Sequence, residues 1–246
     1  MVATTSGWID ARTLVDLADR TRELQGFDRA LAVAEAWGAD PIALVSQPIG
    51  ETNRVVLALR EAVWGAELTA IADCPRCAGR AEFVLDCAAL EMLHADSADT
   101  TGVIAGEVVV RWRAPSVNDL RAAALADDPA ATLRARCLSP TGAGGVELDS
   151  ADLPRQLIDE VESAMMLADP LAEIVVSVDC PECGATFDAD VDPASFVITE
   201  LDAHAARLLR EVDLFARNYG WTESDVFGLS ETRREAYVRL MLEARG

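Results

Sequence analysis

Four cysteines in this sequence have the spacing of metal ligands. Asp73-Cys74-Pro75-Arg76-Cys77 recurs later in the chain as Asp179-Cys180-Pro181-Glu182-Cys183. The thiolates of two such CxxC pairs are the ligand set of a tetrahedral Zn²⁺ site. A site with four thiolates leaves no open position for water or substrate. We therefore expect one structural zinc ion per chain, held by Cys74, Cys77, Cys180 and Cys183.

Two other uses of these cysteines remain open. The four side chains could be unmetallated thiols, or one CxxC pair could carry out thiol–disulfide chemistry. A redox CxxC is expected at the N-terminus of a helix, where the helix dipole lowers the thiol pKa. Strand-like residues follow both motifs here, at 81–86 and 187–191, so we place redox chemistry behind metal binding.

Other residues that could do chemistry occur singly. Cys87 and Cys137 have no partner at ligand spacing, and we expect both to be small buried hydrophobic side chains. The two histidines, His94 and His204, lack an accompanying nucleophile motif, so we expect surface or packing roles for them. Residues 142–145 are glycine-rich, but no lysine follows, which indicates a flexible loop rather than a phosphate-binding loop. We expect no catalytic activity.

The charged residues of the chain exclude several classes of function. Of the 246 residues, 42 are Asp or Glu and 21 are basic, which gives a formal net charge of −21. All the basic residues are arginine, which excludes P-loop lysines, Schiff-base chemistry and lysine general bases. A surface of this charge repels phosphate backbones, so we expect no nucleic acid among the partners.

The hydropathy of the chain bears on its compartment. The first 25 residues carry charges throughout and no uninterrupted apolar core, unlike a signal peptide. No apolar run elsewhere is long enough to cross a bilayer, so we expect no membrane association. We predict a cytoplasmic protein, in a compartment where thiols stay reduced and paired cysteines more often bind metals.

The elements that must position the cysteines are two β-hairpins. Residues 66–73 and 81–86 read as the arms of one hairpin, and residues 172–178 and 187–191 as the arms of another. Each CxxC motif lies at the hairpin tip, where its proline pre-sets φ for a turn. We therefore predict a zinc ribbon assembled from two distant hairpins, within residues 66–88 and 170–192.

The remaining segments read mainly as helices, and the predicted fold class is α+β. Residues 1–65 form an N-terminal helical segment, with helices over 10–24, 28–37 and 52–64. Residues 66–192 form the zinc-ribbon body, whose insertion at 89–169 holds a strand at 107–113, a helix capped by Ser116 and Asp119, helices at 130–137 and 152–169, and a long loop at 139–150.

The C-terminal segment, residues 193–246, begins with a long amphipathic helix at 194–219. Its apolar stripe has spacings of three and four residues: Leu201, Ala205, Leu208, Val212, Phe215 and Tyr219. A short helix capped by Thr222 and a last helix at 231–244 follow, the latter with Tyr237, Leu240 and Met241 facing inward. We expect the stripe to pack within the chain, with a partner helix or an oligomer as the alternative.

Several short stretches of the sequence match a known family. The C-terminal part contains Leu201-Asp202-Ala203-His204-Ala205-Ala206-Arg207-Leu208-Leu209-Arg210-Glu211-Val212, then Tyr219-Gly220-Trp221-Thr222-Glu223-Ser224-Asp225-Val226 and Leu229-Ser230-Glu231-Thr232-Arg233-Arg234. Leu59-Arg60-Glu61-Ala62 and Trp64-Gly65 precede the first CxxC, and Asp169-Pro170-Leu171-Ala172-Glu173-Ile174 precedes the second. From about residue 47 onward the chain resembles the phage T4-type baseplate (hub) family, associated with contractile injection systems.

This resemblance implies a non-enzymatic structural or assembly component of the baseplate or hub of a phage-tail-like apparatus. Its partners would be baseplate, hub or spike proteins, and it would lie within a particle assembled inside the cell. Two residues depart from the family pattern: Asp213 stands where a histidine is expected, and His204 where an aromatic is expected. The alternative from composition and motifs is a zinc-ribbon adaptor in another cytosolic complex.

Overall fold

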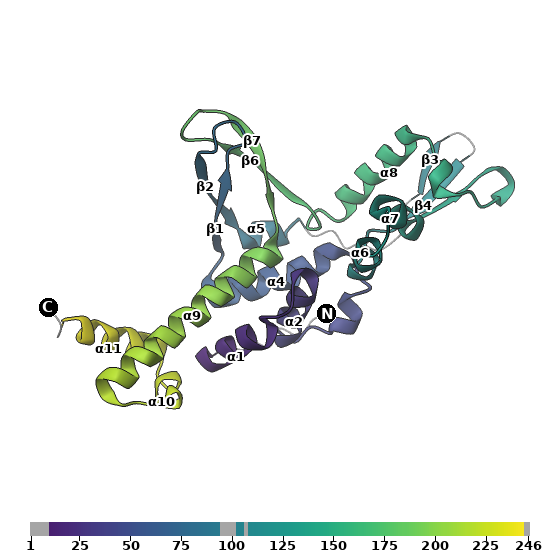
Figure 1. The fold of residues 1–246 in the computed structure, drawn as a ribbon. Helices are drawn as coiled ribbons and strands as arrows, with labels where there is room; N and C mark the ends of the chain where they lie inside the picture. Colours follow the sequence, from purple (N-terminus) through teal and green to yellow (C-terminus); the bar gives the residue numbers. More distant parts are fainter. Residues whose placement is uncertain (1–9, 94–101, 106–107, 244–246) are drawn as a thin grey trace. The chain divides into compact units, whose positions relative to one another are not determined.

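The computed structural model describes residues 10–93, 102–105 and 108–243 and confirms an α+β fold (Figure 1). Its contacts divide the chain into two compact units. Unit 1 joins the two ends of the chain, residues 1–29 and 195–246, and unit 2 holds residues 30–194. No helix of the described part has the length and apolar character needed to cross a membrane.

Unit 1 is helical. Its elements are α1 (Ala11–Thr21), the start of α2 (Gly26–Ala36), nearly all of α9 (Pro193–Tyr219), α10 (Glu223–Phe227) and α11 (Glu231–Glu243). Asp10 caps α1 by accepting a hydrogen bond from the Thr13 amide at 2.7 Å. Thr222 and Asp225 form the expected capping box of α10. Gly220, at a φ of 68°, follows the end of α9.

The core of unit 1 forms where α9, α10 and α11 meet. Phe215, Val226 and Met241 are buried there, and the rings of Trp221 and Tyr237 pack beside Phe215. Phe215 thus lies inside the unit, as expected for the apolar stripe of α9. The expectation for Leu240 is wrong, because 56% of this residue is exposed.

Residues from the N-terminal end belong to unit 1 because polar contacts join them to α9 and α10. Buried Arg29 donates to Asp202 on α9, with one bond of 2.9 Å, and also to Thr21 at the end of α1. The Arg12 guanidinium lies 5.7 Å from the centre of the Phe227 ring. The compact units therefore do not coincide with the segments 1–65, 66–192 and 193–246, which follow chain order alone.

Unit 2 contains three small antiparallel sheets, with strand orders β1–β2, β3–β4–β5 and β6–β7. The strands are β1 (Glu67–Asp73), β2 (Arg80–Asp86), β3 (Gly102–Ala105), β4 (Val108–Trp112), β5 (Leu138–Thr141), β6 (Ile174–Asp179) and β7 (Thr186–Val191). The helices are most of α2, then α3 (Pro41–Leu44), α4 (Ile49–Trp64), α5 (Cys87–Glu91), α6 (Val117–Ala124), α7 (Pro129–Cys137) and α8 (Arg155–Ala168). Both predicted CxxC hairpins are therefore confirmed.

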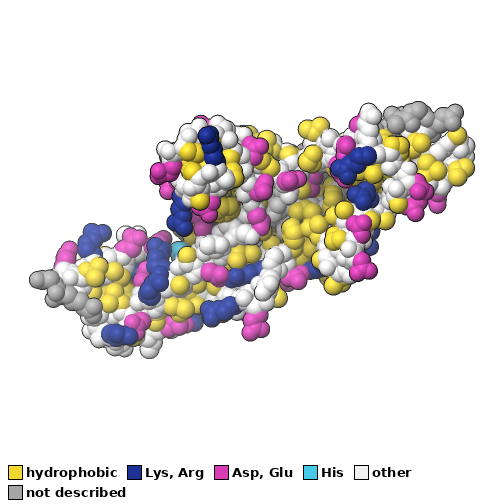
Figure 2. All heavy atoms as spheres, turned by 45° about the horizontal axis from the view of Figure 1, so that its top comes forward, with side chains coloured by type: hydrophobic (Ala, Val, Ile, Leu, Met, Phe, Trp, Pro, Cys, Tyr) yellow, Lys and Arg dark blue, Asp and Glu magenta, His cyan; other side chains and the backbone are white. Residues whose placement is uncertain are grey.

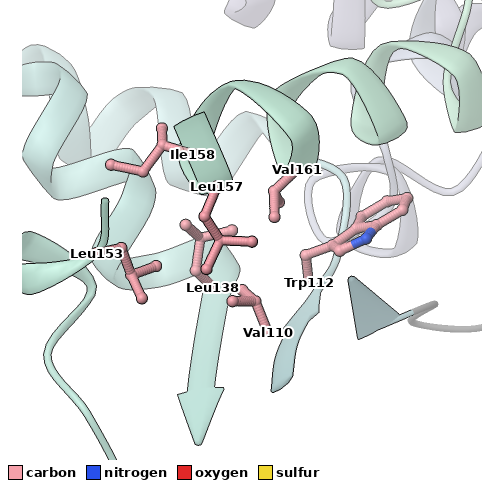
Figure 3. Close-up of a cluster of buried hydrophobic side chains, with 7 residues drawn as sticks. All are labelled: Val110, Trp112, Leu138, Leu153, Leu157, Ile158 and Val161. Atoms are coloured by element: carbon pink, nitrogen blue, oxygen red, sulfur yellow. The ribbon is translucent and has the colours of Figure 1, made fainter. Parts of the chain in front are cut away.

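The insertion between the hairpins has its own core (Figure 3). Val110 and Trp112 of β4 and Leu138 of β5 pack against Leu157, Ile158 and Val161 of α8, with Leu153 at the side. The sheet side chains come from one face of the strands and the α8 side chains recur at helical spacing. Burial of these side chains holds α8 across the sheet.

The prediction of a continuous loop at 139–150 is wrong. Residues 138–141 form β5, which pairs with β4 and places Pro140 opposite Val110. A proline fits there because β5 is the edge strand of its sheet, where an N–H is not required for a further ladder. Short 3-10 turns follow at Ala143–Gly145 and Ser150–Asp152.

Smaller differences concern where helices begin. Helix α2 starts at Gly26, so Asp28 lies in its first turn instead of capping it. Helix α8 starts at Arg155, with Pro154 at the N-cap position. The sequence did not predict α3 or β3, both of which are only four residues long.

Candidate metal centre

The two hairpins bring the four predicted cysteines together. Their Sγ atoms all lie within 4.8 Å of one another. Cys74 and Cys183 are 3.8 Å apart across the hairpins, and Cys77 and Cys180 are 3.6 Å apart. A zinc ion with Zn–S bonds of about 2.3 Å separates its sulfur ligands by about 3.8 Å in a tetrahedron. The sulfurs therefore already have the spacing of a metal-bound set.

The cross-hairpin sulfur distances are too long for disulfide bonds. A disulfide holds its sulfurs about 2.05 Å apart. None of the six cysteines forms a disulfide in the structure. Among the described residues, no second group of three or more His, Cys, Asp or Glu side chains has a comparable arrangement.

Each hairpin places its two cysteines by the same turn. The Cys74 amide donates to the Gly79 carbonyl, and the Cys180 amide donates to the Ala185 carbonyl, both at 2.9 Å. Inside these rings the Ala78 and Gly184 amides donate back to the carbonyls of Cys74 and Cys180. The same backbone positions donate and accept in both turns, so the repeated sequence motif is also a repeated backbone structure.

The residue after the second cysteine of each motif has a left-handed backbone. Ala78 has a φ of 56° and Gly184 a φ of 67°. Glycine adopts this conformation at little cost, whereas a Cβ makes it unfavourable. Ala78 is the one non-glycine residue of the described chain with positive φ, so the turn imposes strain on the first motif.

The next residue explains why the two motifs differ. A Cβ at Gly79 would lie 2.7 Å from Cγ of Glu182 and 3.1 Å from Sγ of Cys77. Gly79 thus allows the second motif to approach the first one closely. The second motif has Ala185 at the corresponding position.

Contacts below the cysteines hold the hairpins against each other. Ala81 of β2 and Val178 and Ala189 of the β6–β7 hairpin are buried together, with Phe83 and Phe187 packed against them. This is a small apolar cluster for two separate two-stranded sheets. An isolated hairpin of this size is marginally stable in water, so a further link between the hairpins would add substantially to their stability.

The electrostatics of the cluster favour a cation. The backbone amide of Cys183, followed by that of Glu182, lowers the pKa of Cys180 to about 7, against the effect of burial. At Cys77 the Gly79 amide lowers the pKa, but the thiols of Cys183 and Cys180 outweigh it and raise the pKa to about 12. Four thiolates at this distance repel one another, and a divalent cation removes that penalty.

A second set of contacts positions the base of the β6–β7 hairpin. The Asp169 carboxylate, just after α8, accepts a hydrogen bond of 3.1 Å from the Gly50 amide in the first turn of α4. The Asn53 side chain donates to the Leu171 carbonyl at 2.8 Å. These two bonds tie the start of α4 to the segment between α8 and β6. The sequence pattern did not predict the contact between Gly50 and Asp169, because the two residues are 119 positions apart.

The other candidate residues stay apart from the cluster. Cys87 and Cys137 are buried at the start of α5 and the end of α7, as expected. His204 is half-buried on α9 beside Arg207, and burial followed by Arg207 lowers its pKa. The prediction for His94 falls outside the described residues. Residues 143–145 form a 3-10 turn with positive φ at Gly144 and Gly145.

The four-cysteine cluster can therefore hold a metal ion. Comparison with protein-family models, with curated proteins and with solved structures finds no match to this chain.

Proposed function

We propose that Cys74, Cys77, Cys180 and Cys183 bind one structural Zn²⁺ ion. The observation that carries this proposal is the spacing of the four Sγ atoms, all within 4.8 Å of one another. A tetrahedral set of four sulfur ligands suits zinc or iron–sulfur chemistry. Zinc is preferred here because the two motifs have the short CxxC spacing of zinc ribbons.

The proposed ion joins two hairpins that are far apart in the sequence. One CxxC pair connects β1 to β2 and the other connects β6 to β7, with the whole insertion between them. Binding a metal by groups that are scattered in the unfolded chain adds the binding free energy to the folding free energy. The ion would thereby fix the position of one hairpin relative to the other.

Incubation with a strong chelator tests this structural role. Removal of the ion should coincide with loss of the β1–β2 and β6–β7 hairpins. Circular dichroism and amide hydrogen exchange can detect that loss. If the hairpins keep their protection after the metal has been removed, the ion is not the structural link.

We further propose that the protein is a non-enzymatic assembly component of the baseplate or hub of a contractile injection apparatus. The support is the family resemblance of the sequence from about residue 47 onward, including the stretches 201–212 and 219–226. A metal bound by four thiolates has no position for a substrate, which fits a structural part better than an enzyme.

Affinity purification from the native host tests the assembly role. A tagged copy should co-purify with sheath, spike and baseplate-wedge proteins identified by mass spectrometry, and the complex should survive high salt. Co-purification with RNA polymerase or another cytosolic complex would instead favour the zinc-ribbon adaptor, and a clean monomer would contradict the assembly role.

A further inference from the structure

Two adjoining hollows form a groove on unit 2, and none of the four clustered cysteines lines either of them. Their volumes are about 180 and 370 Å³. Both are lined by Pro115, which precedes the N-cap residue of α6, and by Glu162 and Met165 of α8. Because the hollows share these walls, they can accept successive side chains of a single elongated ligand.

The floor of the groove is apolar and adaptable. Leu133 and Leu138 line the smaller hollow, and Ile49 and Met166 line the larger one. The flexible thioether side chains of Met165 and Met166 can repack around different partners. Met166 is 54% exposed and its neighbour Leu167 is 81% exposed, although both are apolar. Figure 2 shows hydrophobic side chains at the surface of unit 2, with Asp and Glu side chains scattered among them.

The charges around the groove are mostly negative. Glu162 lines both hollows, and Asp169 and Glu173 line the larger one. Asp169 is already bonded to the Gly50 amide, whereas Glu162 and Glu173 form no ion pair within the described part of the chain. Arg134 lines only the smaller hollow. A ligand that fills both hollows therefore places positive groups best beside Glu162 and Glu173.

We propose that this groove is a docking site for an amphipathic helix of a partner protein, with arginine or lysine along one edge of its apolar face. Apolar side chains spaced three and four residues apart would enter the two hollows. The basic edge would lie against Glu162 and Glu173. This proposal concerns a different surface from the metal centre and does not depend on the injection apparatus.

Charge argues against two other occupants. A second copy of this chain would bring a net charge of −21 against the same charge, without any lysine. An anionic lipid surface would be repelled by the carboxylates at the edge of the groove. A basic helix is attracted to both the groove and the chain as a whole.

Methyl NMR with two synthetic helical peptides tests the proposal. The peptides share one leucine-rich apolar face, and their polar faces carry either lysine or glutamate. The lysine peptide should shift the methyl signals of Met165 and Met166 in the full-length protein. The signals of Met92, which is 81% exposed, and Met241, which is buried in unit 1, should stay unchanged. Equal binding of the glutamate peptide, or shifts only at Met92 or Met241, would overturn the proposal.

Charge reversal provides a second measurement. The double variant Glu162→Arg/Glu173→Arg should bind the lysine peptide about tenfold more weakly, since two attractive surface charge pairs are replaced by repulsive ones. The single variant Glu162→Arg should also bind more weakly, and its matched control is Glu160→Arg, on the same helix but outside the lining of the groove, which should lose much less affinity. Equal loss in both single variants would show a nonspecific charge effect. Peptide-independent self-association that shifts Met165 and Met166 would identify a second copy as the occupant and overturn the proposal.

Discussion

Single residues show how closely the two cysteine turns can be compared. The turns have the same hydrogen bonds, but alanine occupies the left-handed position in the first turn and glycine occupies it in the second. The following position is reversed, with Gly79 in the first turn and Ala185 in the second. Glycine is favoured at position 79 because a Cβ there would crowd the Glu182 side chain. No such contact favours alanine at position 78, so its left-handed backbone should lower the stability of the fold.

Ala78→Gly should therefore stabilise the metal-bound protein. Relief of the left-handed strain stabilises the folded state by about 1–2 kcal/mol. The greater freedom of glycine in the unfolded chain opposes this gain by about 0.4–1 kcal/mol. We expect a net gain of about 0.5–1 kcal/mol in urea unfolding. Gly184→Ala is the matched control and should lose a similar amount, because its Cβ would meet no atom within 4 Å and only the backbone strain remains. A less stable Ala78→Gly protein would contradict this interpretation.

Elements depend on polar contacts that the sequence pattern does not reveal. Asp119, buried at the start of α6, accepts hydrogen bonds from Ser116 Oγ and Arg136 Nε, both at 2.7 Å, and from Arg113. These bonds connect α6 to the end of β4 and to α7. The capping box of Ser116 and Asp119 was predicted from their spacing, but the two arginines could not be, since they come from other elements.

The Asp119 contacts predict a specific pH dependence. Burial raises the pKa of Asp119, but the bonds from Arg113, Ser116 and Arg136 outweigh it and hold the pKa well below its usual value. The carboxylate binds fewer protons in the folded state, so it stabilises the fold above the unfolded pKa of about 3.9. That stability is lost as the pH falls through the lower folded pKa.

The measurement compares the wild-type protein with Asp119→Asn. At neutral pH the variant should be about 2 kcal/mol less stable, because charged hydrogen bonds are lost around a buried group. The difference between the two proteins should shrink as the pH drops below about 4, where the unfolded Asp119 carboxyl becomes protonated. A difference that stays constant down to that range would rule out the Asp119 carboxylate as its source.

The first turn of α4 contacts Asp169 closely, and this contact can be tested by substitution. A Cβ at Gly50 would lie 1.8 Å from Oδ1 of Asp169, so Gly50→Ala must displace the carboxylate that bonds this turn. Overpacking of this kind costs about 1–3 kcal/mol in thermal or urea unfolding. Gly142→Ala is the control, because its Cβ would lie at least 3.5 Å from the Leu148 side chain. Equal stability of both variants would show that Asp169 does not hold α4.

The whole molecule was predictable in its local parts and less so in its long-range contacts. The hairpins, the cysteine cluster and the long helix α9 follow from repeated motifs and from regular apolar spacing. The grouping of residues 1–29 with 195–246 does not, since it depends on contacts such as Arg29 with Asp202. Strand β5 was missed because Pro140 and the surrounding polar residues lack strand periodicity, and only pairing with β4 reveals it.

Loss of the cysteines should affect unit 2 most strongly. Cys180→Ser/Cys183→Ser should lower the melting temperature severely, because two of four ligands cannot hold the ion and the hairpins then depend on one small apolar cluster. Cys137→Ala is the control: it changes a buried cysteine outside the cluster and should keep the metal. An unchanged melting temperature in the double variant would contradict a structural role for the site.

The zinc content of the purified protein tests the central claim most directly. Elemental analysis, combined with titration of accessible thiols, should find one zinc ion per chain and four cysteines protected until a strong chelator is added. Cys180→Ser/Cys183→Ser should contain no zinc. A metal-free native protein in which Cys74, Cys77, Cys180 and Cys183 all react freely with a thiol reagent would contradict the account. That result would favour the alternative in which the CxxC pairs are unmetallated thiols or carry out thiol–disulfide chemistry.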